Sequence, residues 1–265
     1  MAPRITIDKL SYRYFADGNP VFSDFSLDIP GGTCCALLGP TGAGKTTLLE
    51  ILSGVAGSQC KTSLAAGSLQ IGDERYESIP QAALFPKVGL VLQDPEVQIS
   101  GIRDTVATEV EFTLEQLSIP VAERERRVRN TLNELALAPL AQRHPQEVSG
   151  GERQRVALAS ILVAAPPFLL LDEPANALDG RSQQLLREIL RARKGSTTMI
   201  VSDYSIDLSL GLADLFVVLA EGNIVFQGTS ADLFRNLDPL RDFLPLDYWT
   251  LLRGRKPQSR VRVPL

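Results

Sequence analysis

The chain has 265 residues, of which 44% are hydrophobic and 22% charged, and its formal net charge is −4. This length allows a large core with a substantial subdomain, and the acidic balance gives no electrostatic basis for nucleic acid as the main partner. The three cysteines, Cys34, Cys35 and Cys60, include an adjacent pair, which excludes a disulfide framework and favours a reducing compartment.

The N-terminal stretch, residues 4–30, alternates apolar and polar side chains as an antiparallel sheet with one buried face does. The alternation falls into three expected strands, Ile5–Ile7, Tyr12–Phe15 and Phe25–Ile29. The first residues lack the apolar core of a signal peptide, which favours a cytoplasmic protein.

Five short runs of mostly apolar residues are typical of buried parallel strands covered by helices. These expected strands are Cys34–Leu38, Val88–Leu92, Phe168–Leu171, Thr198–Ser202 and Leu215–Leu219. Small and polar residues from Gly57 to Ser68 indicate a flexible loop after the first of them.

No strand pattern appears between about residues 100 and 165. Val121, Val128, Leu132 and Leu135 recur there at helical spacing within a charged segment, which predicts a surface helix with one apolar face. We therefore expect an α/β fold with an N-terminal antiparallel β subdomain and a helical insert at about residues 100–165.

The longest apolar stretch, residues 156–171, is too short to span a bilayer. It also contains Pro166 and Pro167, which would break a membrane helix. We interpret it as a buried helix, a Pro–Pro turn and the strand that follows. A soluble, cytoplasmic protein is expected, which would reach the membrane only through a partner.

The segment Gly39-Pro40-Thr41-Gly42-Ala43-Gly44-Lys45-Thr46 fits the phosphate-loop pattern G-x-x-x-x-G-K-[ST] between an expected strand and a helix-forming segment that starts at Thr47. The glycines let backbone N–H groups wrap a phosphate chain, and the helix presents its positive end to the same anion. Lys45 would reach the β- and γ-phosphates, and the Thr46 hydroxyl would ligate magnesium. The pattern predicts binding of a nucleoside triphosphate.

Two carboxylates, Asp172 and Glu173, follow the expected strand Phe168–Leu171. Ligands of open α/β sheets bind at the carboxyl edge of the strands. Asp172 is therefore placed to hold magnesium, directly or through water, and Glu173 to orient or deprotonate an attacking water.

The segment Ser149-Gly150-Gly151-Glu152 begins a helix, since Ser149 and Glu152 form a capping box. Capping leaves the two glycines unexplained, and glycines at a helix start let backbone N–H groups approach an anion closely. Here the sequence resembles the ATP-binding cassette (ABC) family, whose signature reads L-S-G-G-Q. Val148 replaces the leucine and Glu152 the glutamine, and Glu152 either faces phosphate or caps its own helix.

The resemblance covers about residues 4–230, which we assign to an ABC ATPase domain, and leaves residues 231–265 as a C-terminal tail. It implies a phosphate-loop, RecA-like core that binds ATP and Mg²⁺. It also implies a head-to-tail dimer with a second ABC ATPase subunit, in which each ATP lies between the phosphate loop of one subunit and the signature of the other.

Further site residues are implied by the resemblance alone. Gln93, after the strand that ends at Leu92, would contact magnesium or the lytic water, and Asp179 would meet the opposite subunit. An aromatic residue near the N-terminus would stack on adenine. Tyr14 is our choice and Tyr12 the alternative, because the two point to the same side of a strand.

Within the family, residues 93–99 and 105–112 are similar to the ATPases of energy-coupling-factor importers, which take up vitamins or transition-metal ions. In such systems two ATPases pair under a transmembrane coupling protein, and a separate membrane protein binds the substrate. The chain is thus expected on the cytoplasmic face of the cell membrane.

Most family members have a histidine after the fourth core strand, but here Asp203 or Tyr204 occupies that position. The only histidine, His144, precedes the signature and is expected on the surface. A carboxylate cannot donate a hydrogen bond to a phosphate oxygen. We therefore expect slow hydrolysis at this chain's own loop, with most turnover at the partner's loop, which favours a heterodimer.

Two other functions stay open at this point. One is a cytosolic ABC-type ATPase switch without a transporter, and the other is a nucleotide-dependent regulatory subunit with little hydrolysis. The basic run at residues 253–262 is expected to be a solvated end, with contact to anionic lipid or to a partner as the alternative.

Overall fold

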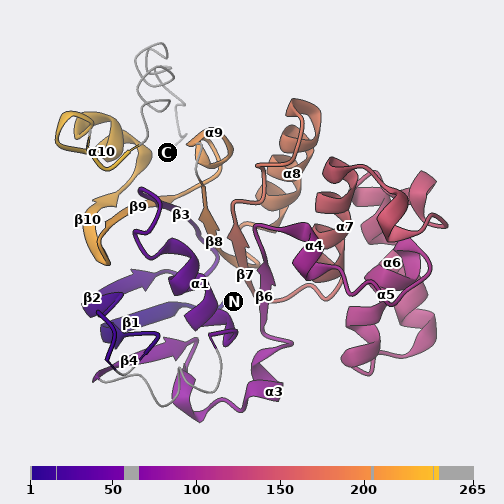
Figure 1. The fold of residues 1–265 in the computed structure, drawn as a ribbon, viewed down its shortest axis with the longest axis horizontal. Coiled ribbons are helices and arrows are strands. Elements are labelled where there is room, and N and C mark those ends of the chain that lie inside the picture. The colour runs from indigo at the N-terminus through magenta and orange to yellow at the C-terminus, as the bar shows by residue number, and fades with distance from the viewer. Residues whose placement is uncertain (1, 16, 57–65, 204–205, 241, 245–265) are drawn as a thin grey trace, which may run out of the picture.

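The first sheet of the computed structural model, which describes residues 2–15, 17–56, 66–203, 206–240 and 242–244, is antiparallel and lies at the N-terminus (Figure 1). Its strand order is β2-β1-β4-β5. The bounds are β1 Ile5–Tyr12, β2 Phe22–Ile29, β4 Ala66–Ile71 and β5 Glu74–Arg75. The expected antiparallel sheet is confirmed, with its strands divided differently.

A β-bulge explains the difference in β1. Ile5–Ile7 and Tyr12–Phe15 were expected as separate strands, but β1 is continuous to Tyr12 and ends there. The pairing register shifts between Ile7 and Leu10, where Lys9 has a φ of 51°. A bulge breaks the two-residue period, so one strand has the sequence pattern of two.

The predicted C-terminal boundary of the loop from Gly57 to Ser68 is wrong. Residues 57–65 lie outside the described residues, and Ala66–Ser68 form the beginning of β4. Those three residues are small, and none of them favours a strand, so the sequence carries no strand signal there. Pairing with β1 decides the conformation.

The second sheet has six strands in the order β10-β9-β3-β8-β7-β6. The bounds are β3 Cys34–Leu38, β6 Val88–Val91, β7 Phe168–Asp172, β8 Thr198–Ser202, β9 Leu215–Ala220 and β10 Asn223–Gly228. Ladders from β6 to β9 are parallel, and β10 joins β9 in the antiparallel direction. The five predicted core strands are confirmed, and their carboxyl ends meet at one edge of the sheet.

Helices cover this core and form the insert. Around the sheet lie α1 Lys45–Ser53, α3 Gln81–Leu84, α8 Gly180–Arg193, α9 Ile206–Ser209 and α10 Ser230–Arg235. The insert contains α4 Pro95–Gln98, α5 Val106–Gln116, α6 Val121–Glu134 and α7 Gly150–Leu162, to the right in Figure 1. Short 3-10 helices span Tyr76–Ser78, Ala138–Leu140, Pro145–Glu147 and Asp238–Leu240.

The apolar face of α6 is confirmed at Val128 and Leu132, and Leu135, the C-cap that follows the helix, is buried as well. Val121 does not belong to it, because this first residue of α6 is 57% exposed. Periodicity identifies the face of a helix but does not show how much of its length the neighbouring helix covers. Across the described ranges, no helix combines the length and the apolar character that a membrane span requires.

Candidate nucleotide-binding site

The phosphate loop connects β3 to α1, as the motif predicts. Gly39, Gly42 and Gly44 all have positive φ values, of 142°, 80° and 103°. A Cβ atom on Gly39 would lie 2.2 Å from the carbonyl oxygen of Leu219, so no other residue fits there without movement. The backbone conformation of the loop therefore depends on its glycines, and the loop together with the start of α1 could present N–H groups to an anion.

Lys45 is almost completely buried at the start of α1, with 7% of its surface exposed. Its Nζ donates hydrogen bonds to the carbonyl oxygens of Gly39 (2.8 Å) and Pro40 (3.0 Å). Burial lowers the pKa of the ammonium group, and the charges of Glu173 and Asp172 oppose that shift. The loop thus holds a dehydrated cation beside the place where phosphate would bind.

Thr46 and Asp172 meet at the carboxyl edge of the sheet. The Thr46 hydroxyl donates to Asp172 Oδ2 (2.7 Å), and the Ser202 hydroxyl donates to Asp172 Oδ1. Hydroxyl and carboxylate oxygens are the ligands that Mg²⁺ takes, so this pair fits a magnesium ion between loop and strand. Ser202, which fixes the carboxylate, was not predicted.

Glu173 begins the loop after β7 in a left-handed conformation, with φ 45°. Its carboxylate oxygen Oε2 accepts hydrogen bonds from Gln93 Nε2 (2.9 Å) and from the Asn176 side chain. The structure thus brings together Gln93 and Glu173, 80 residues apart. Asn176 was not predicted as a contact. Its position in a turn, three residues after the expected catalytic carboxylate, is the signal that could have identified it.

One cleft of about 570 Å³ is lined by the loop residues Thr41, Gly42 and Gly44–Thr47, together with Tyr14, Val21, Gln93, Glu173 and Asn176. Tyr14 is 43% exposed, and its hydroxyl bonds to Thr47 Oγ1 (2.8 Å) and donates to Glu50 (2.9 Å). Tyr12 is buried, with its ring edge-on to that of Tyr14 at 5.3 Å. Of the two tyrosines, Tyr14 faces the cleft, as preferred from the sequence.

The signature segment lies at the start of α7, where Ser149 is the N-cap and the capping box is complete. Glu152 accepts from the backbone N–H and the hydroxyl of Ser149 (both 2.8 Å), and the backbone hydrogen bond holds the pKa of its carboxyl below the usual range. Glu152 therefore caps its own helix. Gly150 is exposed and Gly151 half-buried, and neither belongs to the lining of the cleft.

Asp203 is 2% exposed, with its backbone N–H bonded to the Leu37 carbonyl (3.3 Å) and its Oδ2 accepting from the Ser209 hydroxyl (3.3 Å). It is not part of the cleft lining, while Tyr204 lies outside the described residues. His144 is half-buried, because it caps the short helix at Pro145–Glu147 through its Nδ1. It is thus partly exposed, which agrees with its expected place on the surface.

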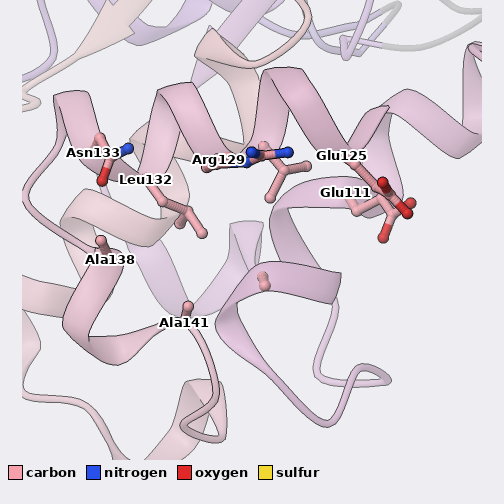
Figure 2. Close-up of a pocket in the computed structure, with 9 residues that line it drawn as sticks. Glu111, Glu125, Arg129, Leu132, Asn133, Ala138 and Ala141 are labelled. Atoms are coloured by element: carbon pink, nitrogen blue, oxygen red, sulfur yellow. The ribbon is translucent and has the colours of Figure 1, made fainter. Parts of the chain in front are cut away.

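A second cavity, of about 420 Å³, lies between α5, α6 and the turn at Ala138–Ala141 (Figure 2). Glu111, Glu125 and Arg129 stand at its rim over an apolar floor that includes Leu132. None of the predicted site residues lines it. Its carboxylates and the helical walls give no phosphate-binding geometry.

Comparisons with known proteins agree with this geometry. Residues 22–176 match the family model described as ABC transporter. The chain is 33% identical over 246 residues to the energy-coupling factor transporter ATP-binding protein EcfA1 of Leuconostoc mesenteroides, covering 91% of this chain and 86% of that protein. It is 34% identical over 245 residues to the nickel import ATP-binding protein NikO of Rhodobacter capsulatus, a match that covers 91% of this chain and 95% of that protein.

Among solved structures, cbiO1 of Clostridium perfringens, described as part of the ABC transporter complex cbiONQ, superposes with a TM-score of 0.75. That match has 26% sequence identity and covers 90% of this chain and 93% of cbiO1. The similarity spans both the sheets and the helical insert.

Proposed function

The chain belongs to the ABC transporter family of ATP-binding, ATP-hydrolysing subunits, and we propose that it drives an energy-coupling-factor-type importer of a vitamin or a transition-metal ion. Residues 4–230 form the ATPase domain and residues 231–265 the C-terminal tail. The relatives named for energy coupling and for nickel import support this choice of transporter class.

The contact of Gln93 and Glu173 beside the phosphate loop carries the proposal. Lys45 binds the β- and γ-phosphates, and Tyr14 stacks on adenine at the other end of the cleft. Glu173 accepts a proton as water attacks the γ-phosphorus and the bond to the ADP oxygen breaks. Gln93 positions that water. Thr46 and Asp172 would hold a magnesium ion, which would neutralise phosphate charge.

The signature completes the site only between two subunits. A Cβ atom added to Gly150 would have no neighbouring atom within 4 Å. The start of α7 is therefore open to a ligand from outside this chain. The triphosphate of a second ATPase subunit fits there, because the exposed N–H groups of a helix start attract anions. ATP thus joins the two subunits, and hydrolysis releases them.

An apolar groove of about 300 Å³ supports a membrane partner. It lies between the core and the insert and is lined by residues that include Val55, Phe85, Leu90, Leu117 and Ile161. Val55 and Phe85 are 59% and 50% exposed. We assign this groove to an amphipathic helix of the transmembrane coupling protein, which holds the chain on the cytoplasmic face of the membrane, while a separate membrane protein binds the substrate.

Slow hydrolysis at this chain's own loop follows from Asp203. Its carboxylate is buried against Ser209, away from the cleft lining, so it supplies no donor to the γ-phosphate. A single lost transition-state donor typically reduces the rate about 10²- to 10³-fold. A regulatory subunit with little hydrolysis is therefore the second candidate function, and it has the same composite site.

The experiment is affinity purification of the tagged chain from detergent-solubilised membranes, followed by size-exclusion chromatography of a Glu173→Gln variant with and without Mg·ATP. We expect two co-purifying membrane proteins and an ATP-dependent ATPase dimer. Phe85→Glu should abolish membrane-protein recovery, whereas Phe234→Glu, on α10, should not. Recovery of neither membrane protein would favour the cytosolic switch, and an ATPase rate unchanged by the membrane partners would favour the regulatory subunit.

A further inference from the structure

We propose that the ion pair between Glu96 and Arg153 links this chain's own nucleotide site to its signature segment. Because the signature serves the opposite site in the proposed dimer, the pair passes the occupancy of one site to the other. The inference rests on the proposed function for its consequence, but the link itself lies within one chain. Arg153 acts as a positioning residue, since it lies outside the cleft lining.

The link begins at Gln93, which contacts Glu173 and is followed directly by α4. Asp94 caps α4 by accepting from the Glu96 backbone N–H (2.9 Å). The Gln98 side chain accepts from the Leu92 N–H (2.9 Å) and donates to the Leu90 carbonyl (3.0 Å). Gln93 and Glu96 therefore move as one unit with the end of β6.

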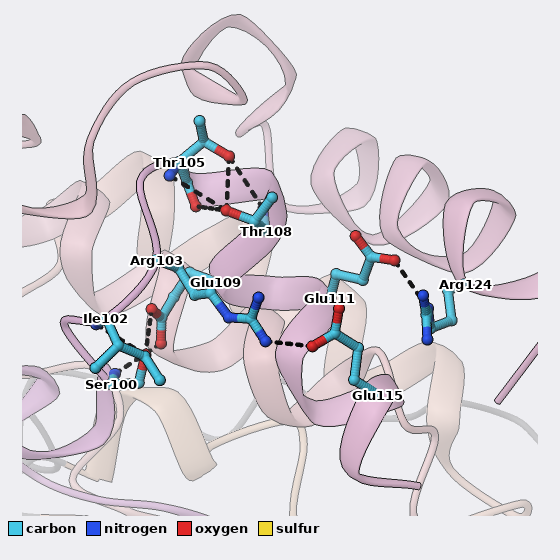
Figure 3. Close-up of polar contacts among 9 residues, drawn as sticks. All are labelled: Ser100, Ile102, Arg103, Thr105, Thr108, Glu109, Glu111, Glu115 and Arg124. Carbon is cyan, nitrogen blue, oxygen red and sulfur yellow. Dashed lines mark hydrogen bonds and ion pairs between the residues drawn. The ribbon is translucent and has the colours of Figure 1, made fainter. Parts of the chain in front are cut away.

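The far end of this segment is also fixed (Figure 3). The backbone N–H and the hydroxyl of Ser100 each donate to one oxygen of Glu109, both at 2.7 Å. Glu109 belongs to α5 and is only 3% exposed, so two strong donors replace the water that its carboxylate loses. Arg103 pairs with Glu115 and lies 4.7 Å above the ring of Phe112. A displacement at Gln93 is thus not absorbed by a loose loop.

On α7, Arg153 is the residue through which a displacement of α4 would reach the signature segment. Its guanidinium pairs with Glu96 and also donates to the carbonyl oxygens of Gln146 (3.3 Å) and Val148 (3.4 Å). Val148 directly precedes Ser149, the N-cap of the signature helix. One planar cation thus holds α4 and the residues before the signature together, over a separation of 57 residues between Glu96 and Arg153.

The pair joins a shielded guanidinium to an exposed carboxylate. The Arg153 side chain is 22% exposed and that of Glu96 is 68% exposed, whereas in the control pair on the outer helix α6 the guanidinium of Arg126 is 62% exposed. The Arg153 Nε–H is buried and has no hydrogen-bond partner in the described part of the chain. An unmet buried donor costs free energy, and a second arrangement of the guanidinium that satisfies it would recover that cost.

The test is hydrogen–deuterium exchange of the full-length chain, with and without Mg·AMP-PNP, at a concentration where size-exclusion chromatography reports a monomer. We expect nucleotide to slow exchange of the amides in residues 148–153 by about two- to fivefold, the range of a coupling carried by one partly exposed pair. Glu96→Gln and Arg153→Gln should each abolish this response, and the double variant should behave as either single variant does. Arg126→Gln is the matched control and should keep the response.

A response that persists in Arg153→Gln, or losses that add in the double variant, would overturn the link, as would its absence from the wild-type chain. Thermal melting separates transmission from unfolding, since loss of such a pair should lower Tm by less than about 4 °C. An ATP-dependent dimer of Glu173→Gln is scored separately. Its absence refutes the composite site, while the exchange experiment still decides whether the intrachain link exists.

Discussion

Lys45→Met should weaken ATP binding and, at the same time, stabilise the nucleotide-free chain. Lys45 is 7% exposed, and its Nζ donates to the carbonyl oxygens of Gly39 and Pro40. The chain therefore carries a largely dehydrated cation before any phosphate arrives. Methionine has a similar length and no charge, so it fills the same space without that cost.

The loss of affinity follows from the charge interaction. A unit charge about 4 Å from a phosphate oxygen contributes about 4 kcal/mol at an effective dielectric constant of about 20. Since about 1.4 kcal/mol is a factor of ten, this amounts to roughly a 10³-fold change in Kd. Because folding has already dehydrated Lys45, little further desolvation cost offsets this gain. Isothermal titration with Mg·ATP should thus show a Kd raised about 10²- to 10³-fold.

The gain in stability has a defined pH dependence. Burial lowers the pKa of Lys45 below its ordinary value of 10.5. Below the folded-state pKa, Lys45 is protonated in both the folded and the unfolded chain, and the free-energy cost of burying its charge is fully present. Between that pKa and 10.5 the unfolded chain binds more protons than the folded chain, so the free energy of unfolding rises with pH. Urea unfolding should show Lys45→Met about 0.5–2 kcal/mol more stable at pH 7, without the alkaline rise. Unchanged ATP affinity, or an apo form less stable than wild type, would refute the reasoning.

The other predictions concern the switch position, the glycines and the cap. Asp203→His should raise ATP turnover at least about tenfold in a steady-state assay, since it restores a hydrogen-bond donor to the γ-phosphate. Ser209→Ala should leave turnover unchanged. Equal rates for Asp203→His and wild type would contradict the assignment of residue 203 to the switch position. Gly39→Ala should leave little folded protein by circular dichroism, because its Cβ would overlap a backbone carbonyl. Gly150→Ala should melt at or above the wild-type temperature, because alanine favours helix, yet lose the ATP-dependent dimer in size-exclusion chromatography. Ser149→Ala should cost about 1 kcal/mol in urea unfolding, through loss of the cap.

Local patterns in the sequence predicted those parts of the fold that local interactions determine. The β3 and β8 bounds agree with prediction at both ends, because a strand buried on both faces is a continuous apolar run. The phosphate loop was predictable because glycine, lysine and threonine at fixed spacing serve one backbone conformation. The edge strand β10 was missed, since its residues alternate between exposed and half-buried without a strong apolar signal.

Contacts between distant segments could not be predicted in this way. Ser202 holds Asp172 from a neighbouring strand, and Asn176 reaches back to Glu173 through a turn. The Asp203 carboxylate accepts a hydrogen bond from Ser209, which the packing of α9 brings near. Residue type indicated that the family's histidine is absent, whereas only the fold shows that the Asp203 carboxylate lies buried beside Ser209.

In the proposed dimer, these placements would make the two nucleotide sites unequal. The phosphate loop and position 203 belong to this chain's own site, so burial of the Asp203 carboxylate would weaken that site alone. The signature at Ser149–Gly151 keeps its cap and the open Gly150, so we expect the site that it completes on a partner to be unaffected. A link between the nucleotide site and the signature segment of this chain would have a use in such a dimer. The slow site would hold ATP while the signature segment adjusts the rate of ATP turnover at the partner's site. The Glu96–Arg153 contact is positioned to transmit this change. Its effect on ATP turnover would be largest for a partner subunit with a histidine at the switch position.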